Sequence, residues 1–454
     1  MGSPYPAGAP APYNPAGMQP GYAPQAMMGA PGPMGPMGPM PGPGPGPMMG
    51  GPAPYAQMAA ANAHGQMTPG MQYGGPVDGS LHEPTGDYVQ YENVVGGNCN
   101  TCGDGCALPP RAYGSFDTLI VWRHGGNYPA ILTTSDPADE GVLGAASTSV
   151  LFGDGYEPGD ADLGGRVTIG LWLDDYQNWS VGGRFLALVE DGANFSANSN
   201  DFSVLAFPFF DTSTGLQNSV VVALPGSGTN AADNTTVNLN NDNTVYMGDV
   251  FVTKHLYTNH GNRWDFVTGY SYAKIEDGFN IFAQYTDQDA GGSGPGVGTV
   301  VTYQDNFTAI NEFHGGQLGL MAEFQDGPFS WRALGKLSLG GMKQEGTISG
   351  TTSYDGTVFD NQGIYARDSN SGTFSRDQFA YIPEVSVDMI YAYNCNLDLK
   401  LGANFIYFSD VITGATMINP NINPNAGAPN DPQFNFVEQD FWVLGMTLGM
   451  EYHY

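Results

Sequence analysis

The chain has 454 residues, of which 13 are Lys or Arg and 44 are Asp or Glu, so its formal net charge is -31. This acidity excludes nucleic acid as a partner, because proteins that bind it need clustered basic side chains. Only 13% of the residues are charged, against roughly 25% in ordinary soluble domains. The composition therefore indicates a protein whose outer surface does not face water.

Residues 1–110 form the first predicted region, a low-complexity segment with a cysteine cluster near its end. Residues 1–60 are almost entirely Pro, Gly, Ala, Met and Tyr, and no Lys or Arg precedes Arg111. Such a stretch buries too little apolar surface to offset its conformational entropy, so we predict a disordered periplasmic spacer or partner-binding arm. The first residues lack the features of a signal peptide, so we expect a removed signal before residue 1 or an engineered start.

Residues 111–454 form the second predicted region, in which about ten segments alternate between apolar and polar residues, as strands with two unlike faces do. The clearest segments are 166–174, 329–339, 396–408 and 442–454. Short turns near 175–177, 257–261, 325–328 and 394–396 alternate with long Gly/Asp/Asn/Ser-rich links near 125–164, 191–242, 277–307, 346–377 and 412–438. Alternation of short turns with long links is typical of outer-membrane barrels.

These patterns predict an all-β fold, a closed antiparallel transmembrane β-barrel of about ten strands with long outer loops; eight to twelve strands fit the sequence. No apolar run is long enough for a transmembrane helix, and a closed sheet is the other structure that lipid tolerates. An even strand number places both ends of the barrel on the periplasmic side.

Strand parity assigns most of the charged side chains of residues 111–454 to the inner face, because a charge facing lipid near the membrane centre costs a few kcal/mol. The assigned residues are Asp117, Arg123, Arg166, Arg184, Glu190, Asp249, Asp265, Glu323, Arg332, Lys336, Glu384, Asp388, Lys400 and Glu451. A barrel of about ten strands is narrow, so we favour a network of ion pairs that fills the lumen. A narrow selective channel for ions or small solutes is the alternative.

Four cysteines and two acidic links are candidate sites outside this lumen. Cys99, Cys102 and Cys106 precede the first strand and Cys395 lies in the last short turn, so an oxidising periplasm predicts two disulfides, one joining Cys395 to the cluster; unpaired or locally paired thiols are the alternative. In the links, Asp154, Asp160 and Asp162 are weak candidates for Ca²⁺, with ordinary solvated loops favoured. We expect no other cofactor or metal.

Three stretches carry a resemblance to one known family. The first begins at residues 141–144 (GVLG) and continues through 150–153 (VLFG) to 164–174 (GGRVTIGLWLD). The other two are residues 419–421 (NPN) and 440–449 (DFWVLGMTLG). In combination they resemble the seventh type of putative β-barrel porin, found in planctomycetal bacteria, from about residue 115 to residue 454. The resemblance implies an integral protein of the outer membrane and names a porin.

The last residues also resemble the C-terminal assembly signal of outer-membrane barrels, whose order of polar, glycine, apolar and aromatic residues is matched by Thr447, Gly449, Tyr452 and Tyr454. The resemblance implies membrane lipid and the outer-membrane assembly machinery as partners, while a homo-oligomer stays open.

Three function classes remain. We favour a porin that passes small solutes or ions, or a structural component of the outer membrane. A secreted surface-layer or adhesive β protein is the alternative. An outer-membrane hydrolase is the least favoured class, since the chain has no G-x-S-x-G motif, and we expect no enzyme and no catalytic residue.

Overall fold

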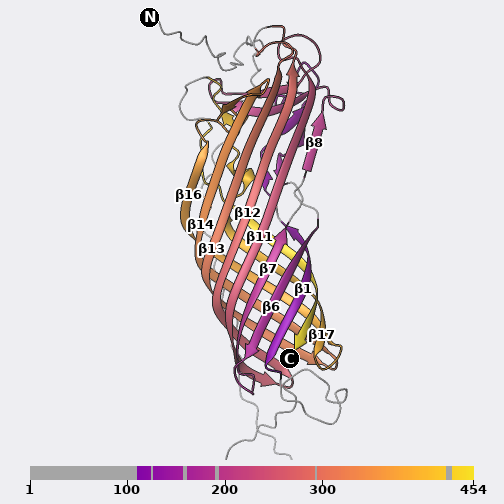
Figure 1. The fold of residues 1–454 in the computed structure, drawn as a ribbon, viewed down its shortest axis with the longest axis vertical. Helices are drawn as coiled ribbons and strands as arrows, with labels where there is room; N and C mark the ends of the chain where they lie inside the picture. The colour runs from indigo at the N-terminus through magenta and orange to yellow at the C-terminus, as the bar shows by residue number, and fades with distance from the viewer. Residues whose placement is uncertain (1–109, 124–125, 157–160, 190–193, 292–293, 426–431) are drawn as a thin grey trace, which may run out of the picture. The chain divides into compact units, whose positions relative to one another are not determined.

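The computed structural model describes residues 110–123, 126–156, 161–189, 194–291, 294–425 and 432–454. Ten long strands form its main sheet: β1 (Ala112–Arg123), β6 (Asp162–Trp172), β7 (Trp179–Val189), β11 (Ala232–Asn259), β12 (Asn262–Asp287), β13 (Val300–Asp326), β14 (Phe329–Tyr354), β16 (Gly372–Ala392), β17 (Leu397–Val411) and β19 (Gln439–His453). Each pairs antiparallel with the next, and β1 pairs with β19, so the sheet closes on itself (Figure 1). The predicted closed antiparallel barrel of ten strands is confirmed.

The ring strands differ greatly in length. β1, β6 and β7 have 11 or 12 residues, close to the roughly 9–11 that a strand needs to cross a bilayer. β11 to β14 have 26 to 28 residues, so they continue far beyond the upper ends of the short strands (Figure 1). We call this continuation the extended section. In it, β8 (Asn194–Asn198) pairs with β11 and β15 (Thr357–Asp360) pairs with β14.

The links between the long strands are shorter than the sequence suggested. Residues 232–242, 277–287, 300–307 and 346–354 are strand rather than loop. Their outward positions carry Asn, Asp and Gly, which are depleted in strands, and polar Thr, and this composition concealed the alternation of their inward apolar residues. The turns at the opposite end of the barrel are short, as predicted.

The described residues of the long links fold into the extended section. There β3 (Leu132–Thr134), β4 (Ser149–Phe152), β9 (Leu205–Asp211), β10 (Leu216–Ala223) and β18 (Asn421–Ile422) make a second sheet, β2 (Asn127–Tyr128) pairs with β5 (Gly155–Tyr156), and α1 (Gly414–Met417) is the one helix among the described residues. No helix of these residues has the length and hydropathy needed to cross a membrane.

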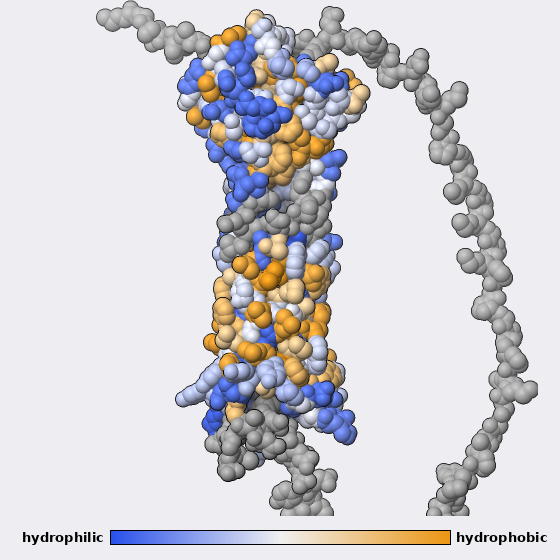
Figure 2. Space-filling model, turned by 90° about the vertical axis from the view of Figure 1, so that its right-hand side faces the viewer, coloured by the Kyte–Doolittle hydropathy of each residue, from blue (hydrophilic) through white to orange (hydrophobic). Residues whose placement is uncertain are grey.

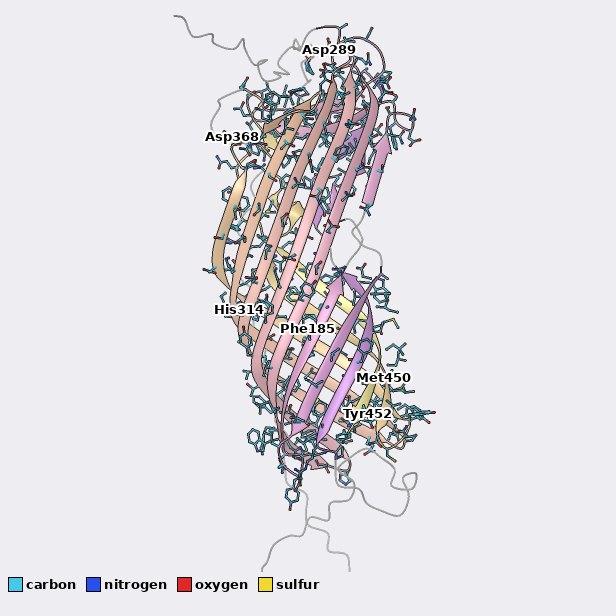
Figure 3. All side chains as sticks on the ribbon, in the orientation of Figure 1. Phe185, Asp289, His314, Asp368, Met450 and Tyr452 are labelled. Atoms are coloured by element: carbon cyan, nitrogen blue, oxygen red, sulfur yellow. The ribbon has the colours of Figure 1, made fainter. Side chains whose placement is uncertain are left out.

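The outer surface of the short-strand half is apolar. Figure 2 shows hydrophobic residues gathered over this half, giving way to hydrophilic residues at the turn end. Phe185, Met450 and Tyr452 lie there and are each more than half exposed, whereas Asp289 and Asp368 lie at the far end of the extended section (Figure 3). Since the side chains of a strand alternate between its two faces, this apolar belt leaves the intervening residues for the lumen.

Candidate functional site

The inward side chains of each strand stack in layers along the lumen. On β11, starting from the turn end, they are Thr253, Phe251, Asp249, Met247, Val245 and Asn243. A polar position is therefore followed by two apolar ones and then by another polar one. The two ring strands that pair with β11 repeat this order: β7 with Arg184, Leu186 and Leu188, and β12 with Ser271, Ala273, Ile275 and Asp277.

The first polar layer is centred on four charged residues, Arg184, Asp249, Lys336 and Glu384, which we call the tetrad. Arg184 is ion-paired with Asp249 at 2.5 Å and also with Glu384. Lys336 Nζ lies 2.8 Å from Asp249 and 2.9 Å from Glu384. No side chain of the tetrad is more than 9% exposed, and its two cations balance its two anions. The tetrad thus joins β7, β11, β14 and β16 across the lumen.

A second group lies beside the tetrad on the strands that close the ring. Asp117 on β1 accepts from Arg166 on β6 at 2.8 Å and pairs with Lys400 on β17 at 2.8 Å. Asp388 on β16 is buried nearby, and its Oδ1 has no hydrogen-bond partner among the described residues. Gly449 on β19 makes room for this group, because a Cβ there would overlap Asp117 Oδ1.

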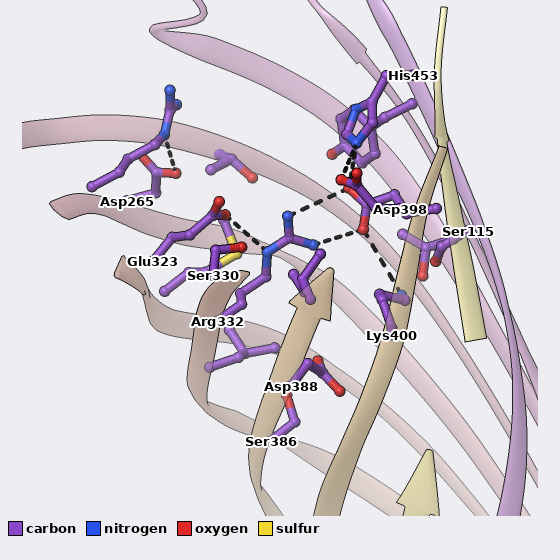
Figure 4. Close-up of a pocket in the computed structure, with 18 of the residues that line it drawn as sticks. Ser115, Asp265, Glu323, Ser330, Arg332, Ser386, Asp388, Asp398, Lys400 and His453 are labelled. Carbon is purple, nitrogen blue, oxygen red and sulfur yellow. Dashed lines mark hydrogen bonds and ion pairs between the residues drawn. The ribbon is translucent and has the colours of Figure 1, made fainter. Parts of the chain in front are cut away.

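A rim of charged side chains lies between these groups and the turn end. Arg332 bonds Glu451 at 2.7 Å and Glu323 at 3.1 Å, and His453 lies 3.0 Å from Asp398 (Figure 4). Arg263 and His255 both contact Asp265, at 2.7 and 3.0 Å. Apart from Glu384 and His255, the charged side chains of the rim and of the two inner groups line a pocket of about 420 Å³. We call this space the turn-end pocket.

An apolar layer lies directly above the tetrad. Every member of this lower apolar layer is at most 2% exposed, and it includes Leu119, Leu186, Met247, Ile275, Phe313, Met342, Ile382, Ile406, Phe408 and Phe441. The layer draws on nine of the ten ring strands, all except β6, and so comes from both sides of the lumen. Water therefore has almost no contact with these side chains.

A second polar layer separates the lower apolar layer from the extended section. Arg123 pairs with Asp162 at 2.8 Å and donates to Asn243 Oδ1 at 2.7 Å, and Asn243 in turn donates to Asp277 at 2.8 Å. Asp277 also accepts from the backbone N–H of Gly414 at 2.6 Å. The loop that carries α1 is thereby bonded to the barrel wall.

The extended section encloses an upper apolar core. The linking loops supply Ile131, Phe152, Phe207, Tyr365, Ile412 and Met417, and the long strands supply Val237, Phe279, Phe307 and Ile348. Tyr365 is fully buried, and its hydroxyl donates to the carbonyl of Pro208 at 2.8 Å. Loops from distant parts of the sequence therefore pack together as a plug between the long strands.

One buried acid holds this plug to the wall. Asp305 on β13 accepts the backbone N–H groups of Ile364, Tyr365 and Ala366 at 3.1, 2.7 and 3.2 Å. Burial raises the pKa of Asp305 to about 6, and the three N–H bonds oppose that rise. The sequence reasoning missed Asp305 and Tyr365. The sequence did carry one indication of Asp305: it is an acid at an inward position of a strand whose other inward residues include the apolar Val301, Phe307 and Ala309.

The predicted lumen residues that the structure describes all have inward, ion-paired or buried side chains: Asp117, Arg123, Arg166, Arg184, Asp249, Asp265, Glu323, Arg332, Lys336, Glu384, Asp388, Lys400 and Glu451. Arg123 stands apart from the others, in the second polar layer. Glu190 lies outside the described residues.

The other predicted sites are only partly described. Cys395 lies between β16 and β17 and lines the turn-end pocket, while Cys99, Cys102 and Cys106 lie outside the described residues, so the pairing stays a prediction. Of the calcium candidates, Asp160 also lies outside the described residues. Asp154 is exposed, and the carboxylate of Asp162 is ion-paired with Arg123. Within the described ranges, no group of three or more His, Cys, Asp or Glu residues could hold a metal ion.

Comparison with known proteins gives one strong match. The model of the family described as Putative beta barrel porin-7 matches residues 113–454. The solved structures that resemble the chain include the outer membrane protease OmpT from Escherichia coli, with 10% identity, a TM-score of 0.36 and coverage of 76% of this chain and 97% of that chain. A TodX deltaS2S3 mutant monoaromatic hydrocarbon channel has 10% identity, a TM-score of 0.24 and coverage of 76% and 91%. At these TM-scores neither likeness bears on function. No curated protein matches the chain.

Proposed function

Because the chain belongs to the family described as Putative beta barrel porin-7, we propose that it is an integral outer-membrane barrel whose lumen is closed and whose extended section is filled by the upper apolar core. The lower apolar layer is the observation that carries this proposal. In this view the ion pairs of the turn-end pocket cross-link the barrel wall rather than line a path for solutes. The extended section is then a structural element outside the bilayer.

The cost of moving an ion through the lumen supports a closed resting state. An ion that left the tetrad would have to pass apolar side chains that have almost no contact with water. Transfer of an unpaired ion into an apolar medium costs tens of kcal/mol by Born solvation. The upper apolar core presents a second barrier of the same kind. Passage would therefore require both layers to rearrange.

The second candidate is a channel that opens on a signal and passes ions or small solutes. The turn-end pocket favours it, because its wall combines acids and bases facing a space large enough for a small solute. This candidate needs a movement of the side chains in the lower apolar layer. A permanently closed barrel needs none, so the closed barrel is the simpler proposal.

Single-channel conductance in a planar bilayer separates these two candidates. The probe is the full chain, purified in detergent and shown to be folded by its altered gel mobility before heating. We expect no current steps from the native chain. A variant with Phe313, Phe408 and Phe441 all replaced by Ser is the matched control, since it removes three rings of the lower apolar layer and should leak. Discrete steps from the native chain would overturn the closed-lumen proposal.

The proposal also includes an orientation and partners. Short turns face the periplasm in outer-membrane barrels, so both ends of the barrel and residues 1–110 belong on that side, and the extended section belongs at the cell surface. Membrane lipid and the assembly machinery are the expected partners, and the proposal contains no catalytic step. Extraction from cells is the test against a secreted adhesive protein, which would dissolve without detergent.

A further inference from the structure

One carboxylate in the wall of the turn-end pocket has no counterion. The six Arg and Lys side chains that line the pocket are all ion-paired with other acids, and Asp388 forms no ion pair among the described residues (Figure 4). The nearby Arg166 and Lys400 both pair with Asp117 instead. Asp388 is thus the acid that the basic side chains of the pocket leave uncompensated.

Burial makes this uncompensated charge costly. Asp388 is 8% exposed, and its Oδ1 lies against Gly402 on the neighbouring strand β17, where a Cβ would overlap it. Oδ1 is sealed from solvent and has no hydrogen-bond partner among the residues that the structure describes, so Oδ2 is the oxygen left to meet the pocket. A buried carboxylate without a counterion takes up either a proton or a cation.

Apolar side chains lie next to Asp388 in the wall of the pocket. Ile390 is the next inward residue on β16, on the side of the turn end. The inward residue on the other side of Asp388 is Ser386, which is paired in register with Leu334 on β14. Leu334 is paired in turn with Met321 on β13. A single negative charge beside a strip of apolar surface suits a cation that has an apolar body.

The pocket is large enough for such a molecule and reaches the turn end of the barrel. Its volume of about 420 Å³ lies within the roughly 300–1,000 Å³ of sites for small organic ligands. Gly327, Pro328 and Asn394, which belong to the short turns, line the pocket as well. At the rim, the side chains of Arg332 and Glu323 are 23% and 27% exposed, so this end of the pocket meets water.

We propose that the turn-end pocket binds a small organic ammonium ion, whose N–H groups pair with Asp388. The apolar body of the ligand then packs against Ile390, Leu334 and Met321. An inorganic cation would balance the charge but would leave the apolar strip uncovered and most of the volume unfilled. This inference goes beyond the closed-lumen proposal and does not depend on it, because a ligand can fill the pocket whether or not the lower apolar layer ever opens.

Equilibrium dialysis of the full chain in a neutral detergent tests the ligand class. The probes are benzylamine and butylamine, which are primary ammonium ions at neutral pH, and benzyl alcohol, which has the ring of benzylamine and no charge. We expect saturable binding of one amine per chain and no saturable binding of the alcohol. The comparison uses the native chain, so it needs no variant to fold. Absence of saturable binding by both amines, equal binding of the alcohol, or displacement of the amine by an equal concentration of K⁺ would each overturn the proposal.

Two acid variants locate the site within the pocket. Asp388→Asn should weaken the binding of benzylamine about ten- to hundred-fold, because it removes a hydrogen bond between charged groups. Asp398→Asn is the matched control, since it removes a negative charge from the same pocket at a position where His453 is the partner, and it should leave the affinity nearly unchanged. Gel mobility before heating shows whether each variant is folded. Equal losses in the two variants would mean that the amine responds to the overall charge of the pocket, which contradicts a site at Asp388.

Discussion

The tetrad gives the sharpest test of how the lumen is held together. Glu384 has no exposed side-chain surface and is ion-paired with both Arg184 and Lys336, so Glu384→Gln leaves two buried cations facing the single carboxylate of Asp249. Removing one partner of a buried ion pair typically costs about 3–5 kcal/mol, because the remaining charge is uncompensated. A domain is stable by only about 5–15 kcal/mol. We therefore expect Glu384→Gln to remove a large part of the stability of the barrel.

Equilibrium unfolding in urea, with the chain in lipid vesicles, measures this loss through tryptophan fluorescence and gel mobility. The double variant Glu384→Gln with Lys336→Met removes one charge of each sign, so it should be more stable than the two single losses added together predict. Glu345→Gln is the matched control on β14. Its partner Lys343 is 50% exposed, and such surface pairs contribute about 0–1 kcal/mol. A cost for Glu384→Gln no larger than that of Glu345→Gln would refute the assignment of the tetrad as a cross-link.

Three further outcomes follow from close contacts and burial. Gly363→Ala adds a Cβ that overlaps Asp305 Oδ1, so it should cost about 1–3 kcal/mol and speed amide exchange in the surrounding loop, whereas Gly278→Ala meets only ordinary contacts and should do neither. Burial raises the pKa of Asp305 to about 6 from an unfolded value near 4, so the contribution of this group to stability is fully present below pH 4 and is lost as the pH rises through 6, by up to about 3 kcal/mol. Asp305→Asn should abolish that part of the pH dependence in urea unfolding between pH 4 and 8. Gly449→Ala adds a Cβ that overlaps the Asp117 carboxylate, so this variant should refold into lipid vesicles with a lower yield than the native chain. The assay contains no assembly machinery, so a lower yield reports on the fold of the barrel itself.

The lumen charges were predictable because a strand has only two faces. Once residues such as Leu337 are assigned to lipid, Lys336 on the same strand must point inward, and the cost of a charge in lipid enforces the same choice. The partners of each charge were not predictable. That Lys336 reaches Asp249 and Glu384 depends on the register between β11, β14 and β16, which no single strand encodes.

The plug could not be read from the sequence for a related reason. Tyr365, Phe207 and Ile131 come from three separate links whose composition is that of solvated loops, and each is buried in one core with the others and with residues of the long strands. Their joint core depends on contacts between residues far apart in the chain. The extension of β11 to β14 was missed because the outward faces of these strands meet water, so polar residues interrupt the apolar pattern that marks a strand in lipid.

The two halves of the sheet are filled differently because they have different surroundings. In the extended section the wall stands in water by our proposal, so burying Phe279, Phe307 and Tyr365 against the loops gains the full hydrophobic effect. In the bilayer, lipid is as apolar as leucine, and burial of an apolar side chain inside the barrel gains less over exposure to lipid. In the membrane half of the barrel, ion pairs such as Arg184 with Glu384 join strands across the lumen. Neither side chain could be left unpaired there without a large cost in free energy. Substitutions in the upper apolar core should therefore destabilise the extended section and leave the membrane barrel closed. Substitutions in the tetrad should destabilise the membrane barrel and leave the packing of the extended section unchanged.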